Sequence, residues 1–301
     1  MHLLSHAFHA MGSPCDLQVY AADAAHAARV CATAVADVTR LEARYSRYRD
    51  DSLLSEINRV AAAGGSIGVD DETAALLDYA VACHRQSDGL FDITSGLLRR
   101  AWNFRSGTLP AAGAVEALLG RVGLHRLRWQ APLLEFPEPG MEIDFGGIVK
   151  EYAADRLAAL CIEAGVGHGC INLGGDVRVI GPHPDGRPWR IGIQHPRTRQ
   201  RTSTVVELMR GAVASSGDYE RAIVVDGVRY GHILNPRTGW PVRRLAAVSV
   251  VGELCVVAGS ASTIAMLKEG DGPAWLEALG LPHLWVDVDG RTGGPLRPGA
   301  D

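Results

Sequence analysis

The sequence predicts an α+β fold, in which a mixed, largely antiparallel sheet forms the body and helices pack against it. Strand-like alternation and helical periodicity both occur, but without the regular βαβ alternation of a doubly wound sheet. Most of the expected strands gather between residues 170 and 251. No internal repeat is found, so the 301 residues are expected to form a single domain, 1–301, with a weak seam near 105–125.

The elements follow from local patterns, taken in chain order. Residues 15–20 alternate between apolar and polar, which is typical of a half-buried strand. An alanine-rich stretch over 22–45 carries an apolar face at helical spacing and predicts a long helix. Asp50–Ser52 then cap a short helix through Asn58. The remaining expectations are a helix after Asp71, a loop with a small helix over 105–125, a hairpin over 126–136, a helix from Gly147 to about Ala164, strands at 170–173, 177–181, 189–194, 204–209, 222–225 and 247–251, a helix over 257–268, a strand over 284–288 and a frayed tail over 291–301.

Composition limits the classes of function. The net charge is -4 and no basic stripe occurs, which argues against a nucleic-acid partner. Six scattered cysteines form no CxxC pair, so we expect buried free thiols and no zinc site. No segment approaches ~20 uninterrupted apolar residues, so no membrane segment is expected. The N-terminus shows neither a signal peptide nor a lipobox, which favours the cytoplasm, although a chain whose leader had been removed would read the same.

The segment from Asp144 to Lys150 lies at a predicted strand-to-helix junction. Its two glycines allow the backbone to approach a ligand, and a helix N-terminus offers unpaired N–H groups to an anion. Lys150 would add a cation beside a phosphate or a flavin edge. The pattern is neither GxGxxG nor a P-loop. The alternative is a tight turn in which Asp144 caps the helix.

His232 falls at the end of a predicted strand, just before a sharp turn over Asn235–Gly239. A histidine there can act as a general base near neutral pH, and the alternative is a structural histidine with satisfied hydrogen bonds. A second double-glycine turn, Asn172–Asp176, reads equally well as a β-turn. The absence of GxSxG and HExxH motifs argues against a serine hydrolase and a zinc protease.

Taken together, an ordered succession of segments resembles the FAD:protein FMN transferase family over about residues 8–270. The segments are Met11–Ser13, Tyr48–Asn58, Phe91–Thr94 followed by Trp102, Asp144–Asp155, Leu173–Asp176, Ser216–Tyr219 and His232–Gly239. The resemblance implies an α+β fold with a flavin cleft and an enzyme that cuts FAD. Such an enzyme moves FMN to a threonine of an acceptor protein and releases AMP, in a metal-assisted phosphoryl transfer.

The resemblance also implies roles for single residues. His232 would be catalytic. The residues that would contact FAD are Met11, Tyr48, Leu90, Phe91, Asp92, Asp144, Lys150 and Ile233. Apolar and aromatic side chains in this set suit the flat isoalloxazine ring, while N–H donors and a cation suit the pyrophosphate.

For the metal, Mg²⁺, the resemblance implies the backbone carbonyl of Gly147 and a pair of side chains four residues apart on one helical face. Thr263 matches the second member of the pair, but Gly259 stands where the family has aspartate. Either Mg²⁺ binds with more water, or another carboxylate such as Asp218 or Asp144 replaces the aspartate, or transfer is weak or absent.

A second departure is Glu151, where the family usually has glycine. A carboxylate at this position needs a metal or Arg156 as its partner, and it could itself serve as the displaced metal ligand.

Two other functions remain open at this point. A non-catalytic FAD carrier or maturation protein is favoured by Gly259, while the intact His232 region counts against it. An FAD pyrophosphatase would use water as the acceptor and release free FMN without any acceptor protein.

Overall fold

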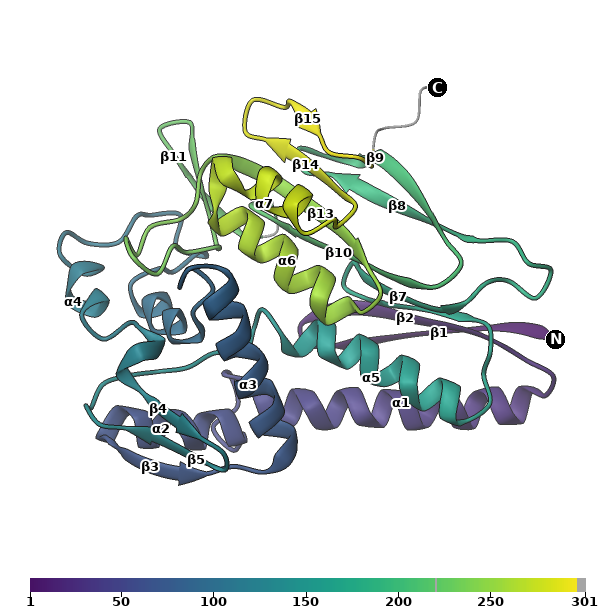
Figure 1. The fold of residues 1–301 in the computed structure, drawn as a ribbon, viewed down its shortest axis with the longest axis horizontal. Coiled ribbons are helices and arrows are strands. Elements are labelled where there is room, and N and C mark those ends of the chain that lie inside the picture. The colour runs from purple at the N-terminus through teal and green to yellow at the C-terminus, as the bar shows by residue number, and fades with distance from the viewer. Residues whose placement is uncertain (220, 297–301) are drawn as a thin grey trace.

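The structure, a computed structural model, describes residues 1–219 and 221–296, with the side chains of 199 and 200 outside the description. Its main sheet runs in the order β1-β2-β6-β7-β10-β13-β14-β15, and each neighbouring pair is antiparallel (Figure 1). This confirms the predicted α+β class with a largely antiparallel sheet. The strands are β1 His2–Ala10, β2 Ser13–Ala21, β6 Gly169–Leu173, β7 Asp176–Gly181, β10 Gly211–Gly217, β13 Leu245–Gly252, β14 His283–Asp287 and β15 Thr292–Gly293.

Helices cover one face of this sheet, and a hairpin covers the other. Helix α1 (Ala24–Tyr45) lies beside α5 (Val149–Glu163), which in turn packs against α6 (Cys255–Leu267); α7 (Gly272–Ala278) follows. Strand residues that face these helices join the largest apolar core, whereas Val177, Val179 and Val213 face the hairpin of β8 (Trp189–His195) and β9 (Thr198–Leu208) in a second core. The sheet is therefore buried on both faces at its centre.

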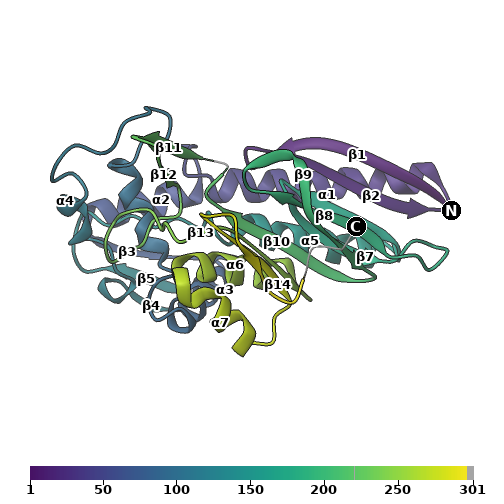
Figure 2. The same cartoon turned by 90° about the horizontal axis from the view of Figure 1, so that it is seen from above.

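The chain between α1 and α5 forms one end of the molecule, and the N-terminus with the start of β1 lies at the opposite end (Figure 2). Its elements are α2 Leu53–Ala63, β3 Gly65–Gly68, α3 Asp71–Gln86, the 3-10 helix η1 Ile93–Arg100, α4 Glu116–Leu119, the 3-10 helix η2 Leu124–Arg126, β4 Arg128–Gln130 and β5 Leu133–Phe136. The hairpin of β11 (Ala222–Val225) and β12 (Val228–Gly231) packs here, because Ile223 shares a third core with Leu97, Leu98 and Trp102. The site described below lies where this end meets the sheet.

Several expected boundaries differ from the structure. Strands β1 and β10 were not predicted, and β9 begins at Thr198 rather than at the expected residue 204. The frayed tail was expected over 291–301, but Thr292–Gly293 pair with β14, and residues 297–301 lie outside the described part of the chain. The six cysteines are buried free thiols, as predicted. Among the described residues, every helix is too short or too polar to span a bilayer.

Candidate active site

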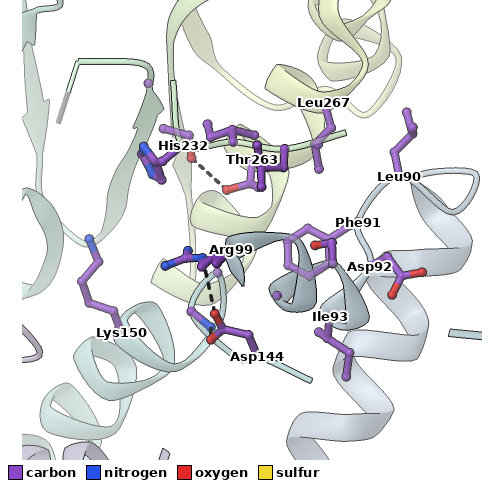
Figure 3. A pocket seen from close by; sticks show the side chains of 18 of the residues that line it. Leu90, Phe91, Asp92, Ile93, Arg99, Asp144, Lys150, His232, Thr263 and Leu267 are labelled. Atoms are coloured by element: carbon purple, nitrogen blue, oxygen red, sulfur yellow. Dashed lines mark hydrogen bonds and ion pairs between the residues drawn. The ribbon is translucent and has the colours of Figure 1, made fainter. Parts of the chain in front are cut away.

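One cavity collects side chains from the loop before η1, the start of α5, strand β10, the segment after β12 and the second half of α6 (Figure 3). Figure 3 shows His232 and Thr263 on one side of it, facing Arg99 and Asp144 on the other. Most of the residues predicted from the sequence line it: Leu90, Phe91, Asp92, Asp144, Gly147, Lys150, His232, Ile233 and Thr263. Segments more than 170 residues apart in the chain thus converge here.

Two predicted residues, Met11 and Tyr48, do not line the cavity but border residues that do. Met11 occupies the β1–β2 turn with φ of 52° and packs, half-buried, against the main core. A Cβ added to Gly174 would lie 2.6 Å from Ser13 Cβ of that turn and 3.9 Å from Lys150 Nζ, so the turn lies close to Lys150. Tyr48 is 75% exposed and follows Arg47, which binds Asp144.

Asp144 belongs to a paired network of charges. Its Oδ2 lies 2.8 Å from Arg47 Nη1 and 3.8 Å from Arg99 Nε, and Arg47 also holds the buried Glu142 at 2.6 Å. Oδ1 accepts a hydrogen bond from the Gly146 N–H. Burial opposes ionisation of Asp144, yet Arg99 and Arg47 hold the pKa of its carboxyl below the ordinary value. The carboxylate is therefore charged and already neutralised by its neighbours.

Asp92 uses its carboxylate within the fold. Oδ1 accepts hydrogen bonds from the Thr94 N–H at 2.8 Å and from the Thr94 hydroxyl at 2.6 Å, which caps the start of η1. Oδ2 accepts the Leu124 N–H at 2.9 Å and lies 3.6 Å from His84 Nε2. Any contact of Asp92 with a ligand would therefore engage a carboxylate that already fixes the local backbone.

His232 follows β12 at the rim of the cavity. Its Nδ1 atom is buried and has no hydrogen-bond partner among the described residues. Burial, and after it the positive charges of Arg99 and Arg221, lowers the pKa of His232 to about 4. The imidazole is consequently neutral near pH 7 and can accept a proton.

The first turn of α5 carries charges that are less evenly paired. Lys150 Nζ lies 2.7 Å from Asp176 Oδ2, and the buried Glu151 stands next to the same aspartate. Burial, followed by the charge of Asp176, raises the pKa of Glu151 to about 7. Arg156, which was considered as a partner of Glu151, does not pair with it. The Arg156 Nε atom lies 3.3 Å from Asp37 Oδ2 instead.

Hydroxyl groups and the start of α5 complete the cavity wall. Ser216 Oγ lies 2.8 Å from both Ser262 Oγ and Thr263 Oγ1. Helix α5 starts after Ile148 without a side-chain cap, and its first-turn residues Lys150 and Glu151 line the cavity. The positive end of the helix dipole there favours an anion. Among the described residues, no group of three or more His, Cys, Asp or Glu side chains is placed to hold a metal ion. A cation here would need carbonyl, hydroxyl and water oxygens as well.

Sequence reasoning missed Arg99 and Leu267, which also line the cavity. Arg99 stands beside Arg100 after an apolar pair, a pattern that reads as a solvated helix end. Only the packing of η1 against Asp144 brings Arg99 to the cavity, and no local signal records that contact.

Several known proteins are similar to this chain in sequence and in fold. A curated FAD:protein FMN transferase of Vibrio cholerae is 31% identical over 80% of this chain and 74% of its own length. One from Chlamydia pneumoniae is 32% identical over 79% of this chain and 76% of its own. The crystal structure of the ApbE protein of Thermotoga maritima superposes with a TM-score of 0.90 at 30% identity and covers 97% of both chains. The apo flavinyl transferase ApbE of Pseudomonas stutzeri gives 0.88 at 27% identity, over 100% of this chain and 98% of that one.

A family model, described as the ApbE family, matches residues 11–285. That span contains every cavity-lining residue described above. The chain belongs to the ApbE family.

Proposed function

We propose that this protein is an FAD:protein FMN transferase, like the relatives that bear this name. It moves the FMN half of FAD to a threonine of an acceptor protein and releases AMP. The observation that carries the proposal is a partly buried histidine, His232, that is neutral near pH 7 and shares one cavity with the cations Arg99 and Lys150 and the uncapped N-terminus of α5. This combination suits a reaction on a diphosphate.

The cavity offers separate places for the two parts of FAD. The pyrophosphate would lie at the start of α5, where Lys150, Arg99 and the positive end of the helix dipole provide positive charge. The isoalloxazine ring would lie against apolar and aromatic surface from Phe91, Ile233 and the exposed ring of Tyr48.

In the proposed reaction, the threonine hydroxyl attacks the phosphorus on the FMN side. A new P–O bond forms to the threonine oxygen, the bond from that phosphorus to the bridging oxygen breaks, and AMP leaves with the bridging oxygen. His232 accepts the proton of the hydroxyl. Its low pKa keeps the imidazole neutral before FAD arrives, and the negative phosphates would then raise its pKa and make it a stronger base.

A hard divalent cation, which we take to be Mg²⁺, fits the donors that are present. The Thr263 hydroxyl and the Gly147 carbonyl are oxygen donors at the cavity, and Glu151 Oε2 is buried without a hydrogen-bond partner among the described residues. When bound, the cation would offset charge that develops on the phosphate oxygens. We propose Gly147 and Thr263 as two of its ligands.

The test uses purified protein, FAD, Mg²⁺ and a peptide with the Asp-Gly-x-Thr pattern that the family resemblance implies for acceptors. Mass spectrometry should show one FMN added to the peptide, and both EDTA and His232→Ala should reduce the rate, the latter by about 10²–10⁴-fold. We expected no such pattern in the chain itself, and hence no self-modification, but this expectation is wrong: Asp289–Thr292 carries the pattern, with Thr292 exposed. The mass of the protein is therefore followed alongside that of the peptide.

The other outcomes separate the competing functions. FAD binding without FMN transfer or AMP release would favour a carrier. Free FMN and AMP, formed equally well without the peptide, would favour an FAD pyrophosphatase. If His232→Ala leaves the transfer rate unchanged, His232 is not the general base, although the transferase activity itself stands.

A further inference from the structure

The Glu151 side chain occupies the space that a side chain at position 259 would need. A Cβ built on Gly259 of α6 would lie 2.5 Å from Glu151 Cγ, 3.0 Å from its Cδ and 3.1 Å from its Oε1. Approaches this short force one of the two groups to move. A side chain at position 259 and the present position of the Glu151 side chain therefore exclude each other. While Glu151 of α5 points toward α6, only glycine fits at 259.

The carboxylate of Glu151 is buried with incomplete compensation. The residue is 7% exposed, and its Oε2 has no hydrogen-bond partner in the part of the chain that the structure describes. The nearest cation, Lys150, binds Asp176 at 2.7 Å, so two carboxylates face one ammonium group. Two carboxylates that share one ammonium group leave negative charge away from water, and a bound cation would balance it.

The other carboxylates considered as replacements are already engaged. Asp144 is held by Arg47 at 2.8 Å, and Asp218 is held by Arg197 at 2.8 Å. A cation would have to displace a guanidinium group from either of them. Glu151 is the candidate that needs no such exchange.

The hydroxyl of Thr263 lies on the face of α6 that carries Gly259. Gly259 and Thr263 are four residues apart and share one face of the helix, so Thr263 stands one turn beyond the glycine that Glu151 approaches. The Thr263 hydroxyl reaches the cavity and contacts Ser216 Oγ at 2.8 Å. Gly147, immediately before α5, lines the same cavity.

The geometry points to Glu151 as the carboxylate ligand of a divalent cation at this site, with Gly259 required to make room for it. The ligand that the resemblance places on α6 has thus moved to the facing position on α5. The inference rests on the proposed function, because the cation is the one that assists phosphoryl transfer. It concerns metal binding, however, and can be tested without measuring transfer.

Mn²⁺ is the probe, titrated with and without FAD, and the free ion is followed by electron paramagnetic resonance. Glu151→Gln should weaken Mn²⁺ binding by about 10- to 100-fold or more, since a charged ligand contributes at least as much as the groups that orient ligands. Glu163→Gln is the matched control, because it removes the same charge from an exposed position on the same helix. It should leave the affinity within about twofold.

A reciprocal exchange tests the steric part of the inference. Glu151→Gly alone should lose Mn²⁺ binding, and adding Gly259→Asp to it should recover most of the affinity. Gly259→Asp in the native background should not increase affinity, because its Cβ meets Glu151. Circular dichroism and urea unfolding of each variant establish that it is folded before its affinity is compared.

Two results would overturn the inference: wild-type protein that binds no Mn²⁺ at millimolar concentration with FAD, or Glu151→Gln with wild-type affinity. If Glu151→Gln loses Mn²⁺ while no FMN transfer is found for the wild type, the proposed function fails and the ligand assignment stands. If the wild type transfers FMN and Glu151→Gln keeps the wild-type Mn²⁺ affinity, the proposed function stands and the assignment of Glu151 as a ligand fails.

Discussion

Two buried carboxylates on the wall of the same cavity differ in how their charge is balanced. Asp144 is held by Arg47 and Arg99, and these cations keep the pKa of its carboxyl low despite burial. Glu151 is buried beside another carboxylate, Asp176, and its pKa rises to about 7. The charge of Asp144 is balanced by two arginines, whereas Glu151 shares the single cation Lys150 with Asp176.

The difference distinguishes a charge that stabilises the resting fold from one that the proposed cation would balance. A buried charge with guanidinium partners strengthens the resting fold, since removing one partner leaves the rest uncompensated. A buried charge without a partner is unfavourable until a ligand arrives. Perturbed pKa values alone mark both sites, so the direction of the shift and the partners decide between the two meanings.

The largest expected effect comes from breaking the balanced cluster. Arg47→Ala leaves Glu142 and Asp144 buried without their shared cation, which should lower the free energy of unfolding by about 3–5 kcal/mol. Urea unfolding followed by circular dichroism measures it. Arg128→Ala is the control, because its side chain is 73% exposed and its pair with Glu135 should contribute less than about 1 kcal/mol. Equal effects of the two substitutions would contradict the assignment of Arg47 to a structural cluster.

A smaller effect should have opposite signs at the two carboxylates. In EDTA, Asp144→Asn removes a charge that two arginines need and should destabilise the fold by about 1–3 kcal/mol. Glu151→Gln keeps the shape, removes repulsion with Asp176 and should leave stability unchanged or slightly higher. Thermal unfolding of both variants in one buffer gives the comparison. A loss at Glu151→Gln as large as that at Asp144→Asn would mean that the contact of Glu151 with Asp176 and Lys150 stabilises the metal-free protein.

The sequence predicts the fold class well because most elements carry their own signal. Helix α1 shows an apolar stripe and is capped by Asp23, and β2 alternates cleanly. Strand β10 gives no such signal. Its residues Gly211–Gly217 are small, it lies between β7 and β13, and α6 packs on one face. Burial on both faces removes the alternation by which a strand is recognised.

The site likewise contains residues that a local sequence pattern predicts and residues that only the tertiary contacts reveal. His232 and the turn before α5 were found because glycines, a lysine and a histidine at a strand end are local patterns. Arg99 was missed, and Arg156, one of the two partners considered for Glu151, binds Asp37 instead. Which cation meets which carboxylate depends on contacts between segments far apart in the chain, and spacing in the sequence does not record those contacts.

The smallest expected effect concerns the cations that face His232. Its pKa is about 4 in the folded protein against an ordinary 6.5, mainly through burial and then through Arg99. The stability linked to this shift is fully present above pH 6.5 and is lost as the pH falls toward 4, because the unfolded chain takes up the proton first. The basic form of His232 therefore persists well below neutral pH, and kcat/KM for FAD should show no acid limb from it above about pH 5.

Arg99→Gln should move that limb upward by about one pH unit, because removing the nearby positive charge makes the imidazolium less unfavourable. The pH profile of kcat/KM measures the limb, and the ring proton resonance of His232, assigned with a His232→Gln variant, gives its pKa directly. Arg100→Gln is the matched control, since the Arg100 side chain is 53% exposed and binds Glu142 instead. A wild-type limb near 6.5 would mean that the cavity does not lower the pKa of His232 at all. A low limb that Arg99→Gln leaves in place would mean that burial, without Arg99, accounts for the low pKa.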